Sequence, residues 1–162
     1  VTALPEVDES YPDTLSGEEI PLYISQEKAA AYRRFMKDNT LLITADTIVW
    51  LDGKVYGKPR DIADAKAMLQ ALSGKTHTVI TGVTLTSLQK QISFAVSTEV
   101  TFAALGDDEI DYYVETYRPL DKAGAYGVQE WIGYIGVTGL KGSYYNVMGL
   151  PIQRLYTELK KF

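Results

Sequence analysis

The sequence predicts an α/β protein in which a mixed, partly antiparallel sheet is flanked by helices. The order of expected elements does not alternate strand and helix regularly, as a doubly wound fold would. A two-residue turn signal, Asp52-Gly53, joins two apolar and β-branched segments. After Asp61 the apolar residues recur at helical spacing instead. The 162 residues suffice for one domain or for two small lobes that share a cleft.

The first expected helix covers residues 18–37. Acidic residues fall in its first turn, where the helix dipole favours negative charge, and Pro21 fits only near the start. Ile24, Lys28, Ala31 and Phe35 fall on one face of this helix. A lysine on such a face most often lies at its edge with its ammonium group in water. An ammonium group on the inward side is also a candidate phosphate ligand.

An acid interrupts the next apolar stretch. Residues 41–45 and 47–51 predict two strands joined at a bend, with Asp46 between them. A carboxylate inside an apolar run is costly unless it is paired or binds a cation. Asp46 is therefore either a residue that turns the chain at a strand end or a metal ligand or general base, and spacing alone leaves both open. Lys58, which follows the returning strand 54–56, has the pattern of a solvated loop lysine.

The middle of the chain predicts a helix followed by a hairpin. Asp61 is placed as an N-cap, an apolar stripe runs to Leu72, and Gly74 ends the helix. Residues 76–86 and 92–102 then predict two paired strands, because β-branched and alternating apolar residues dominate them. The single histidine, His77, begins the first of these strands and is interpreted as an ordinary sheet residue.

The last third of the chain changes in composition. A helix is expected from Asp107 to Pro119, with three acids in its first turn. From 121 to 151 glycines are interleaved with aromatic residues, which predicts ordered, tight loops and strands rather than a flexible linker. This segment contains neither a dinucleotide-binding fingerprint nor a P-loop. It could form a dimer face or line a pocket, and its pattern leaves both open. A short helix is expected from 151 to 159.

Composition excludes several classes of function. No apolar run reaches the twenty or so residues of a membrane helix. A net charge of −5 argues against a protein that binds nucleic-acid polymers. Because the chain has no cysteine, it has no disulfide, thiolate zinc site or cysteine nucleophile, which fits a cytoplasmic location. Glu9 belongs to a short acidic opening that is either a solvated loop or a donor of oxygen ligands to a divalent cation.

A series of short motifs, taken in order, resembles the Maf family, the septum-formation-associated nucleoside triphosphate pyrophosphatases. The resemblance spans nearly the whole chain, so residues 1–162 are expected to form a single Maf-like domain. It rests on these segments: Asp46-Thr47, Gly57-Lys58-Pro59, Leu72-Ser73-Gly74, Thr81-Gly82-Val83, DKAGAYGVQ at 121–129 and GSYYNVMGLP at 142–151.

The resemblance implies a two-lobed α/β fold with a central cleft, similar to the inosine-triphosphate pyrophosphatases. It also implies hydrolysis of a nucleoside triphosphate to the monophosphate and pyrophosphate, assisted by Mg²⁺ or Mn²⁺. The versions of the two long motifs resemble the branch that acts on dTTP and UTP, so pyrimidine triphosphates, including modified ones, are the expected substrates.

Individual residues match the family's functional positions. The resemblance implies that Asp46 is the catalytic carboxylate and a metal ligand together with Glu9. Lys28 and Lys58 match further active-site positions and would neutralise phosphate charge, whereas Gln129 and Thr47 would bind the nucleotide.

Two departures from the family pattern stand out. The family opens with a strand and a Ser-x-Arg-Arg loop that contacts phosphates, and this motif does not occur in residues 1–162. We expect the loop to precede this sequence in a longer chain. In addition, Glu130 and Trp131 follow Gln129 where the family usually has glycine.

Two other functions compete with the pyrophosphatase. A nucleotide-responsive binding protein could act on cell division through a partner, with little turnover, as the family's association with septum formation suggests. A phosphatase that forms an aspartyl-phosphate is less favoured, because Asp46-Thr47-Ile48 lacks the usual second aspartate.

Overall fold

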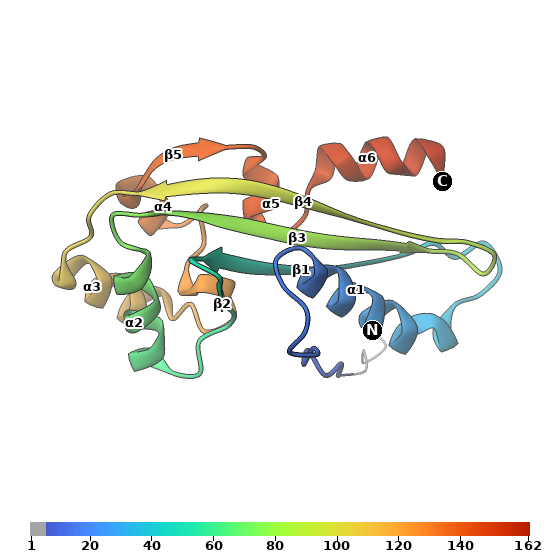
Figure 1. Ribbon diagram of the computed structural model, residues 1–162, viewed down its shortest axis with the longest axis horizontal. Helices are drawn as coiled ribbons and strands as arrows, with labels where there is room; N and C mark the ends of the chain where they lie inside the picture. Colours follow the sequence, from blue (N-terminus) through green and yellow to red (C-terminus); the bar gives the residue numbers. More distant parts are fainter. Residues whose placement is uncertain (1–5) are drawn as a thin grey trace.

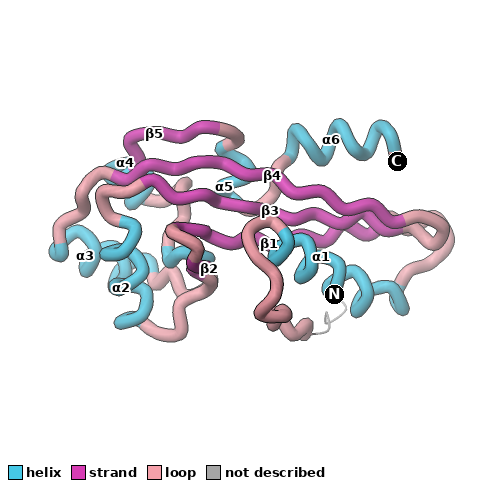
Figure 2. Tube along the Cα trace, viewed as in Figure 1, coloured by secondary structure: helices cyan, strands magenta, loops and turns pink. Residues whose placement is uncertain are grey.

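The computed structural model describes residues 6–162, in which one five-stranded sheet, of order β2-β1-β3-β4-β5, carries helices on both sides (Figures 1 and 2). Its α-helices are α1 Glu19–Tyr32, α2 Ile62–Leu72, α3 Asp107–Tyr117, α4 Trp131–Gly136, α5 Tyr144–Met148 and α6 Ile152–Lys161. Its strands are β1 Leu42–Leu51, β2 Lys54–Tyr56, β3 Thr76–Thr86, β4 Gln91–Phe102 and β5 Val137–Lys141. Two 3₁₀ turns, η1 Arg33–Phe35 and η2 Ala123–Ala125, complete the described elements.

The sheet differs in one respect from the sequence prediction. The α/β class with flanking helices is confirmed, but all four strand pairings among residues 6–162 are antiparallel, so the expected mixed sheet is wrong. Each strand lies beside one that runs in the opposite direction. A parallel pair would have required a crossover connection that returns to the same end of the sheet.

Strand β1 runs without interruption through Asp46. The expected bend at this acid is therefore wrong: Asp46 pairs in register with Gly82 of β3, between the pairs formed by Ala45 and Thr47. A charged residue is tolerated within the strand because its carboxylate points to a cleft with a lysine partner. The Asp52-Gly53 turn is confirmed, since φ is positive at both residues, 51° and 75°.

Helices α1 and α6 cover opposite faces of the long strands (Figure 1). Ile20 and Ile24 of α1 pack with Ile48 and Ile80. Leu155 of α6 packs instead with Val83 and Leu85 of β3. The odd and even residues of a strand point to opposite faces, which agrees with this division. Helix α1 can approach closely because β3 has Gly82 at the contact: a Cβ there would lie 2.4 Å from the Pro21 carbonyl carbon.

The largest core cluster lies at the other end of the sheet, where α2 and α3 pack (Figure 1). Leu69 and Leu72 of α2 and Ile110 and Val114 of α3 are buried against the strand ends. The predicted cap of α2 is confirmed, because the Asp64 N–H donates to Asp61 Oδ1 at 2.8 Å. The lobe of α2 and α3 and the lobe of α1 leave a cleft between them, as a two-lobed fold requires.

The glycine-rich segment is ordered, as predicted, but contains more helix than expected. It forms η2, α4 and α5, with β5 as its one strand within the described residues. Glycine is needed where backbone meets backbone: a Cβ on Gly133 would lie 1.9 Å from the Val128 carbonyl oxygen. Across residues 6–162, the helices are too short or too polar to span a bilayer.

Candidate active site

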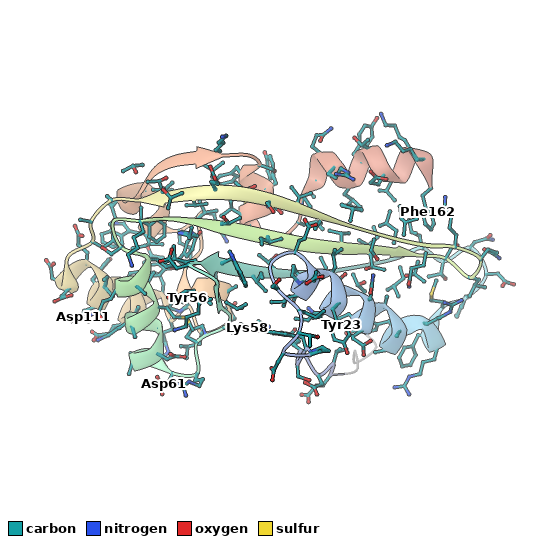
Figure 3. The ribbon with its side chains drawn as sticks, in the orientation of Figure 1. Tyr23, Tyr56, Lys58, Asp61, Asp111 and Phe162 are labelled. Atoms are coloured by element: carbon teal, nitrogen blue, oxygen red, sulfur yellow. The ribbon has the colours of Figure 1, made fainter. Side chains whose placement is uncertain are left out.

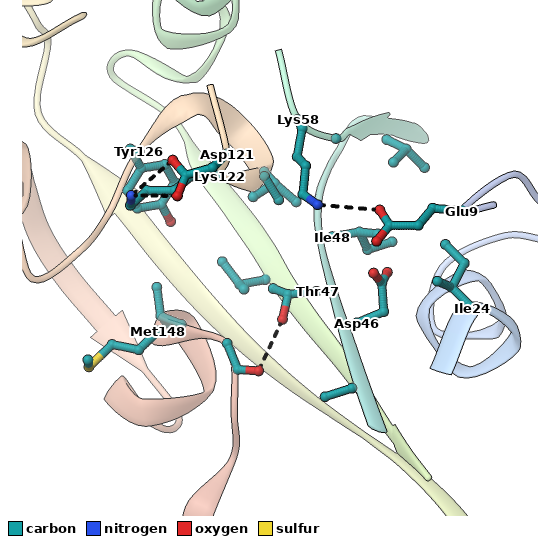
Figure 4. A pocket seen from close by; sticks show the side chains of 18 of the residues that line it. Glu9, Ile24, Asp46, Thr47, Ile48, Lys58, Asp121, Lys122, Tyr126 and Met148 are labelled. Carbon is teal, nitrogen blue, oxygen red and sulfur yellow. Dashed lines mark hydrogen bonds and ion pairs between the residues drawn. The ribbon is translucent and has the colours of Figure 1, made fainter. Parts of the chain in front are cut away.

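A cleft of about 420 Å³ crosses the edge of β1. Five consecutive strand residues, Ala45 to Val49, line it. Successive side chains of a strand point to opposite faces, so a pocket lined by all five must wrap around the strand's edge. This edge is accessible because the short strand β2 pairs only with Val49, Trp50 and Leu51. Figure 4 shows Asp46 and Thr47 pointing to different sides of the strand.

The charged side of the cleft centres on Lys28. Its Nζ donates to Asp46 Oδ1 at 3.0 Å and lies 3.1 Å from Glu9 Oε1, so one ammonium group joins two carboxylates. Lys58 Nζ lies 3.5 Å from the second oxygen of Glu9. Lys28 comes from α1 and Lys58 from the loop after β2, and Figure 4 shows the Lys58 side chain directed toward Glu9. Two carboxylates and two ammonium groups thus form one network.

Burial and charge act differently on these groups. Burial raises the pKa of Asp46 above its ordinary value, against the opposing attraction of Lys28, and the negative charge of Glu9 adds to the rise. Although burial opposes it, the two lysines lower the pKa of Glu9. Burial also disfavours the charged form of Lys28, yet Asp46 and Glu9 together raise its pKa. Asp46 is therefore the carboxylate of the pair that binds a proton more readily.

The facing wall comes from the segment around η2. Asp121, Lys122, Tyr126 and Gln129 line it. Lys122 Nζ lies 3.2 Å from Asp121 Oδ1 and 3.6 Å from Glu130 Oε1, so its charge is already compensated. The Gln129 residue is exposed to solvent, and its main-chain oxygen accepts a hydrogen bond from the Tyr134 hydroxyl at 3.1 Å. The Gln129 side chain is thus available at the mouth of the cleft.

Below this wall, Tyr126 rests on the histidine that sequence analysis assigned to the sheet. His77 Nε2 lies 2.7 Å from the Tyr126 hydroxyl oxygen, and both residues are buried. Burial lowers the pKa of His77 to about 4, so the imidazole is neutral at pH 7. His77 does not line the cleft among the described residues, and its contact supports the tyrosine that does.

A third wall is formed by α5 and the residue that follows it. Val147, Met148 and Gly149 line the cleft there. Asn146 anchors the helix: it is fully buried, and its Nδ2 donates to the Val79 oxygen at 3.3 Å, the Val96 oxygen at 3.0 Å and Thr98 Oγ1 at 3.0 Å. The wall's position is therefore set by hydrogen bonds to two strands.

The hydroxyl of Thr47 is engaged with the same wall. Thr47 Oγ1 lies 2.8 Å from Thr81 Oγ1 and 3.4 Å from the carbonyl oxygen of Gly149. Thr81 Oγ1 in turn donates to the Asn146 main-chain oxygen at 3.3 Å. The threonine side chain therefore holds the wall in place within this hydrogen-bond chain.

A divalent cation would find two protein carboxylates here. Residues 6–162 contain no group of three or more acidic, histidine or cysteine side chains placed to hold a metal ion. Glu9 and Asp46 supply hard oxygen donors on either side of Lys28. Mg²⁺ is commonly bound by one or two carboxylates together with phosphate oxygens and water. The donor set thus fits a cation that arrives with a phosphorylated ligand.

All six residues selected from the sequence line this one cleft: Glu9, Lys28, Asp46, Thr47, Lys58 and Gln129. Their individual roles stay predictions. Sequence reasoning did not single out Tyr126 or Asp121, although both lie inside the 121–129 motif. It also missed Asn146. The sequence feature that could have identified this residue was its position within the 142–151 motif.

Comparison with known proteins places the chain in a family. The family model described as Maf-like protein matches residues 1–162. A dTTP/UTP pyrophosphatase of Phocaeicola vulgatus is 67% identical over 161 residues, which cover 99% of this chain and 83% of that protein. Proteins of the same name are 63% identical in Bacteroides fragilis, with the same coverage, and 48% identical in Flavobacterium psychrophilum, covering 96% of this chain and 80% of that protein.

Proposed function

Because the chain belongs to the Maf family, we propose that it hydrolyses dTTP and UTP to the monophosphate and pyrophosphate. The relatives that bear the name dTTP/UTP pyrophosphatase support the substrates. The observation that carries the proposal is the Lys28 ammonium group held between Asp46 and Glu9, with Lys58 beside them, in an open cleft. The two ammonium groups can bind a polyphosphate, and the largely buried carboxylate of Asp46 can accept a proton from water.

Asp46 acts as the general base. Its carboxylate takes a proton from the attacking water, and its raised pKa makes it a better proton acceptor than an exposed aspartate. Lys28 keeps this carboxylate oriented through its 3.0 Å hydrogen bond. The ammonium groups of Lys28 and Lys58 stabilise the negative charge that develops on the departing pyrophosphate.

Glu9 and Asp46 would hold the divalent cation, Mg²⁺ or Mn²⁺. When bound, such an ion neutralises phosphate charge and polarises phosphoryl oxygens. Glu9 also keeps Lys28 and Lys58 near each other through its two oxygens. Gln129 and Thr47 belong to the nucleotide-binding walls. The cytoplasmic location, the homodimer and the connection with septum formation stay predictions from the sequence.

Product analysis tests the proposal. The chain is offered dTTP, UTP, CTP, ATP, GTP and methylated GTP with Mg²⁺ or Mn²⁺, and pyrophosphate and orthophosphate are assayed separately. We expect pyrophosphate from dTTP and UTP and its loss in Asp46→Asn by about two orders of magnitude or more. Asp111→Asn is the matched control, because Asp111 lies on α3 far from the cleft (Figure 3). Binding without turnover of any triphosphate would instead favour the nucleotide-responsive binding protein.

A further inference from the structure

The wall of the cleft around Gln129 is a tight turn. The Glu130 N–H donates to the Gly127 carbonyl oxygen at 3.0 Å, so Val128 and Gln129 are the central residues of a β-turn. Val128 is buried in the largest core cluster, whereas the Gln129 residue is exposed and lines the cleft. The turn therefore has a buried side that fixes it and an open side that presents Gln129.

One buried hydroxyl contacts both ends of this turn. The Gly127 N–H donates to the Tyr113 hydroxyl oxygen at 3.0 Å, and the Tyr113 hydroxyl donates to Glu130 Oε1 at 3.1 Å. Tyr113 is fully buried on α3 and is not among the described residues that line the cleft, so it holds the turn from behind. The first and last residues of the turn are thus joined through a side chain that lies outside the cleft.

The Tyr113 hydroxyl keeps its proton for this contact. Burial raises the pKa of Tyr113 above its ordinary value, the hydrogen bond from the Gly127 N–H opposes the rise, and the charge of Glu130 adds to it. A protonated hydroxyl can donate to the carboxylate and accept from the Gly127 N–H at the same time. Because its acceptor is a carboxylate, the contact with Glu130 is stronger than one between two neutral groups.

Glu130 also joins the turn to the start of the same wall. Its Oε1 lies 3.6 Å from Lys122 Nζ, and the Glu130 side chain is only 21% exposed. Both side chains pack against Gly127: an added Cβ there would meet Glu130 Oε1 and lie 3.0 Å from Lys122 Cε. A residue with a side chain at this position would therefore push the carboxylate away from Tyr113 and Lys122.

We propose that Tyr113 and Glu130 are positioning residues, which hold the 127–130 turn so that the Gln129 side chain stays where the nucleotide binds. We call this pair the Tyr113–Glu130 clamp. The clamp acts through Gln129 and does not touch the nucleotide. The inference rests on the proposed function, because it takes Gln129 as a nucleotide ligand. Without the clamp the turn would sample other conformations, and the apparent affinity would fall with the fraction of molecules in which Gln129 is in place.

Steady-state kinetics with UTP test the proposal. Tyr113→Phe removes the hydroxyl and keeps the ring, whereas Glu130→Ala removes the carboxylate. We expect each variant to raise KM about tenfold, the size of one net hydrogen bond, with a smaller change in kcat. Glu130→Gln keeps an oxygen that can accept from Tyr113, so we expect this conservative variant to restore most of the affinity.

Tyr117→Phe is the matched control. Tyr117 lies on the next turn of α3 and stacks on Tyr113, with ring centroids 5.1 Å apart. It is not among the described residues that line the cleft. We expect its KM for UTP to equal that of the unmodified chain. An equal rise of KM in Tyr117→Phe and Tyr113→Phe would overturn the proposal.

A Gln129→Ala background tests whether the effect passes through Gln129. In that background the clamp has no ligand group to position, so adding Tyr113→Phe should change KM by less than about twofold. A further rise of about tenfold would overturn the proposal, because the clamp would then act on the cleft without Gln129.

Backbone order parameters from ¹⁵N relaxation test the clamp without turnover. We expect the order parameters of Val128 and Gln129 to fall in Tyr113→Phe and to stay unchanged in Tyr117→Phe. Unchanged values in both variants would overturn the clamp. Urea denaturation checks the fold of each variant, and if Glu130→Ala does not fold, Tyr113→Phe and Glu130→Gln decide.

These outcomes separate the inference from the proposed function. Pyrophosphate release from UTP with the same KM in Tyr113→Phe as in the unmodified chain would sustain the enzyme and overturn the positioning role. Lower order parameters in Tyr113→Phe, in a chain that releases no pyrophosphate from any triphosphate, would sustain the clamp and overturn the proposed reaction.

Discussion

Lys28 Nζ lies 3.0 Å from Asp46 Oδ1, although the lysine stands on α1 and the aspartate in the middle of β1. The Asp46 side chain is 10% exposed and the Lys28 side chain 20% exposed. In so shielded a pair, removal of one partner leaves a charge poorly solvated, which is costlier than the loss of an exposed salt bridge.

The Lys28→Met variant should lose most activity while it keeps its fold. Asp46 and Glu9 would then face each other without their shared cation, and the phosphates would lose a ligand. We expect kcat/KM for UTP to fall by about two orders of magnitude. Lys66→Met is the control, because Lys66 forms ion pairs with Asp111 and Glu115 on α3, outside the cleft. Equal kinetics in the two variants would contradict the assignment.

Glu9→Gln should shift the acidic limb of the pH–rate profile to lower pH. Burial raises the pKa of Asp46, and the charge of Glu9 raises it further. Removing that charge lowers the pKa of Asp46, so the base stays deprotonated to a lower pH. The measurement is kcat/KM against pH for both proteins. The pH at which the acidic limb falls does not depend on the lower maximal rate expected for the variant. A limb that moves to higher pH would show that another group titrates.

Gly82→Ala should destabilise the protein and impair the site. The added Cβ would lie 2.4 Å from the Pro21 carbonyl carbon and 2.5 Å from the Leu22 nitrogen, both main-chain atoms. Helix α1 would have to move, so we expect the free energy of unfolding to fall by about 1–3 kcal/mol. Gly139→Ala is the control, since its Cβ would meet nothing closer than 3.7 Å. Urea denaturation and kcat/KM measure both effects.

Asn146→Leu should loosen the wall made by Val147, Met148 and Gly149. Three acceptors lose the Nδ2 donor, and a buried acceptor left unpaired costs about 1–3 kcal/mol. We expect lower stability and a KM for UTP that rises more than kcat falls, because this wall lines the cleft away from Lys28 and Asp46, where the proposed reaction places the phosphates. Gln70→Leu, which removes an exposed hydrogen bond to Asp107, is the control. An unaltered KM would argue against this positioning role.

Local signals in the sequence predicted local structure well. The Asp61 cap, the Asp52-Gly53 turn and the apolar stripe of α2 depend on neighbours in the chain, so they could be read directly. The continuity of β1 could not, because the partner that makes Asp46 tolerable lies on α1. Phe35, expected on an inward face, is 51% exposed, because α1 ends at Tyr32 and η1 follows there.

The candidate site shows the same division. Motif resemblance selected six residues that the fold brings to one cleft. It did not indicate that the Thr47 hydroxyl would be occupied by Thr81 and Gly149, because those contacts join segments far apart in the sequence. Nor could it place Tyr126 on His77, since a lone histidine in a strand has no sequence signal for its partner.

The paired strands β1, β3 and β4 extend from one end of the molecule to the other. The helices on both sides of the cleft therefore pack on the same three strands. A rigid-body rotation of one lobe against the other would have to bend three hydrogen-bonded strands together. Adjustment to a ligand is therefore confined to parts that can move without the sheet: the Lys28 and Lys58 side chains and the mouth of the cleft. The width of the cleft between the lobes is therefore set by the sheet and does not change by hinge motion.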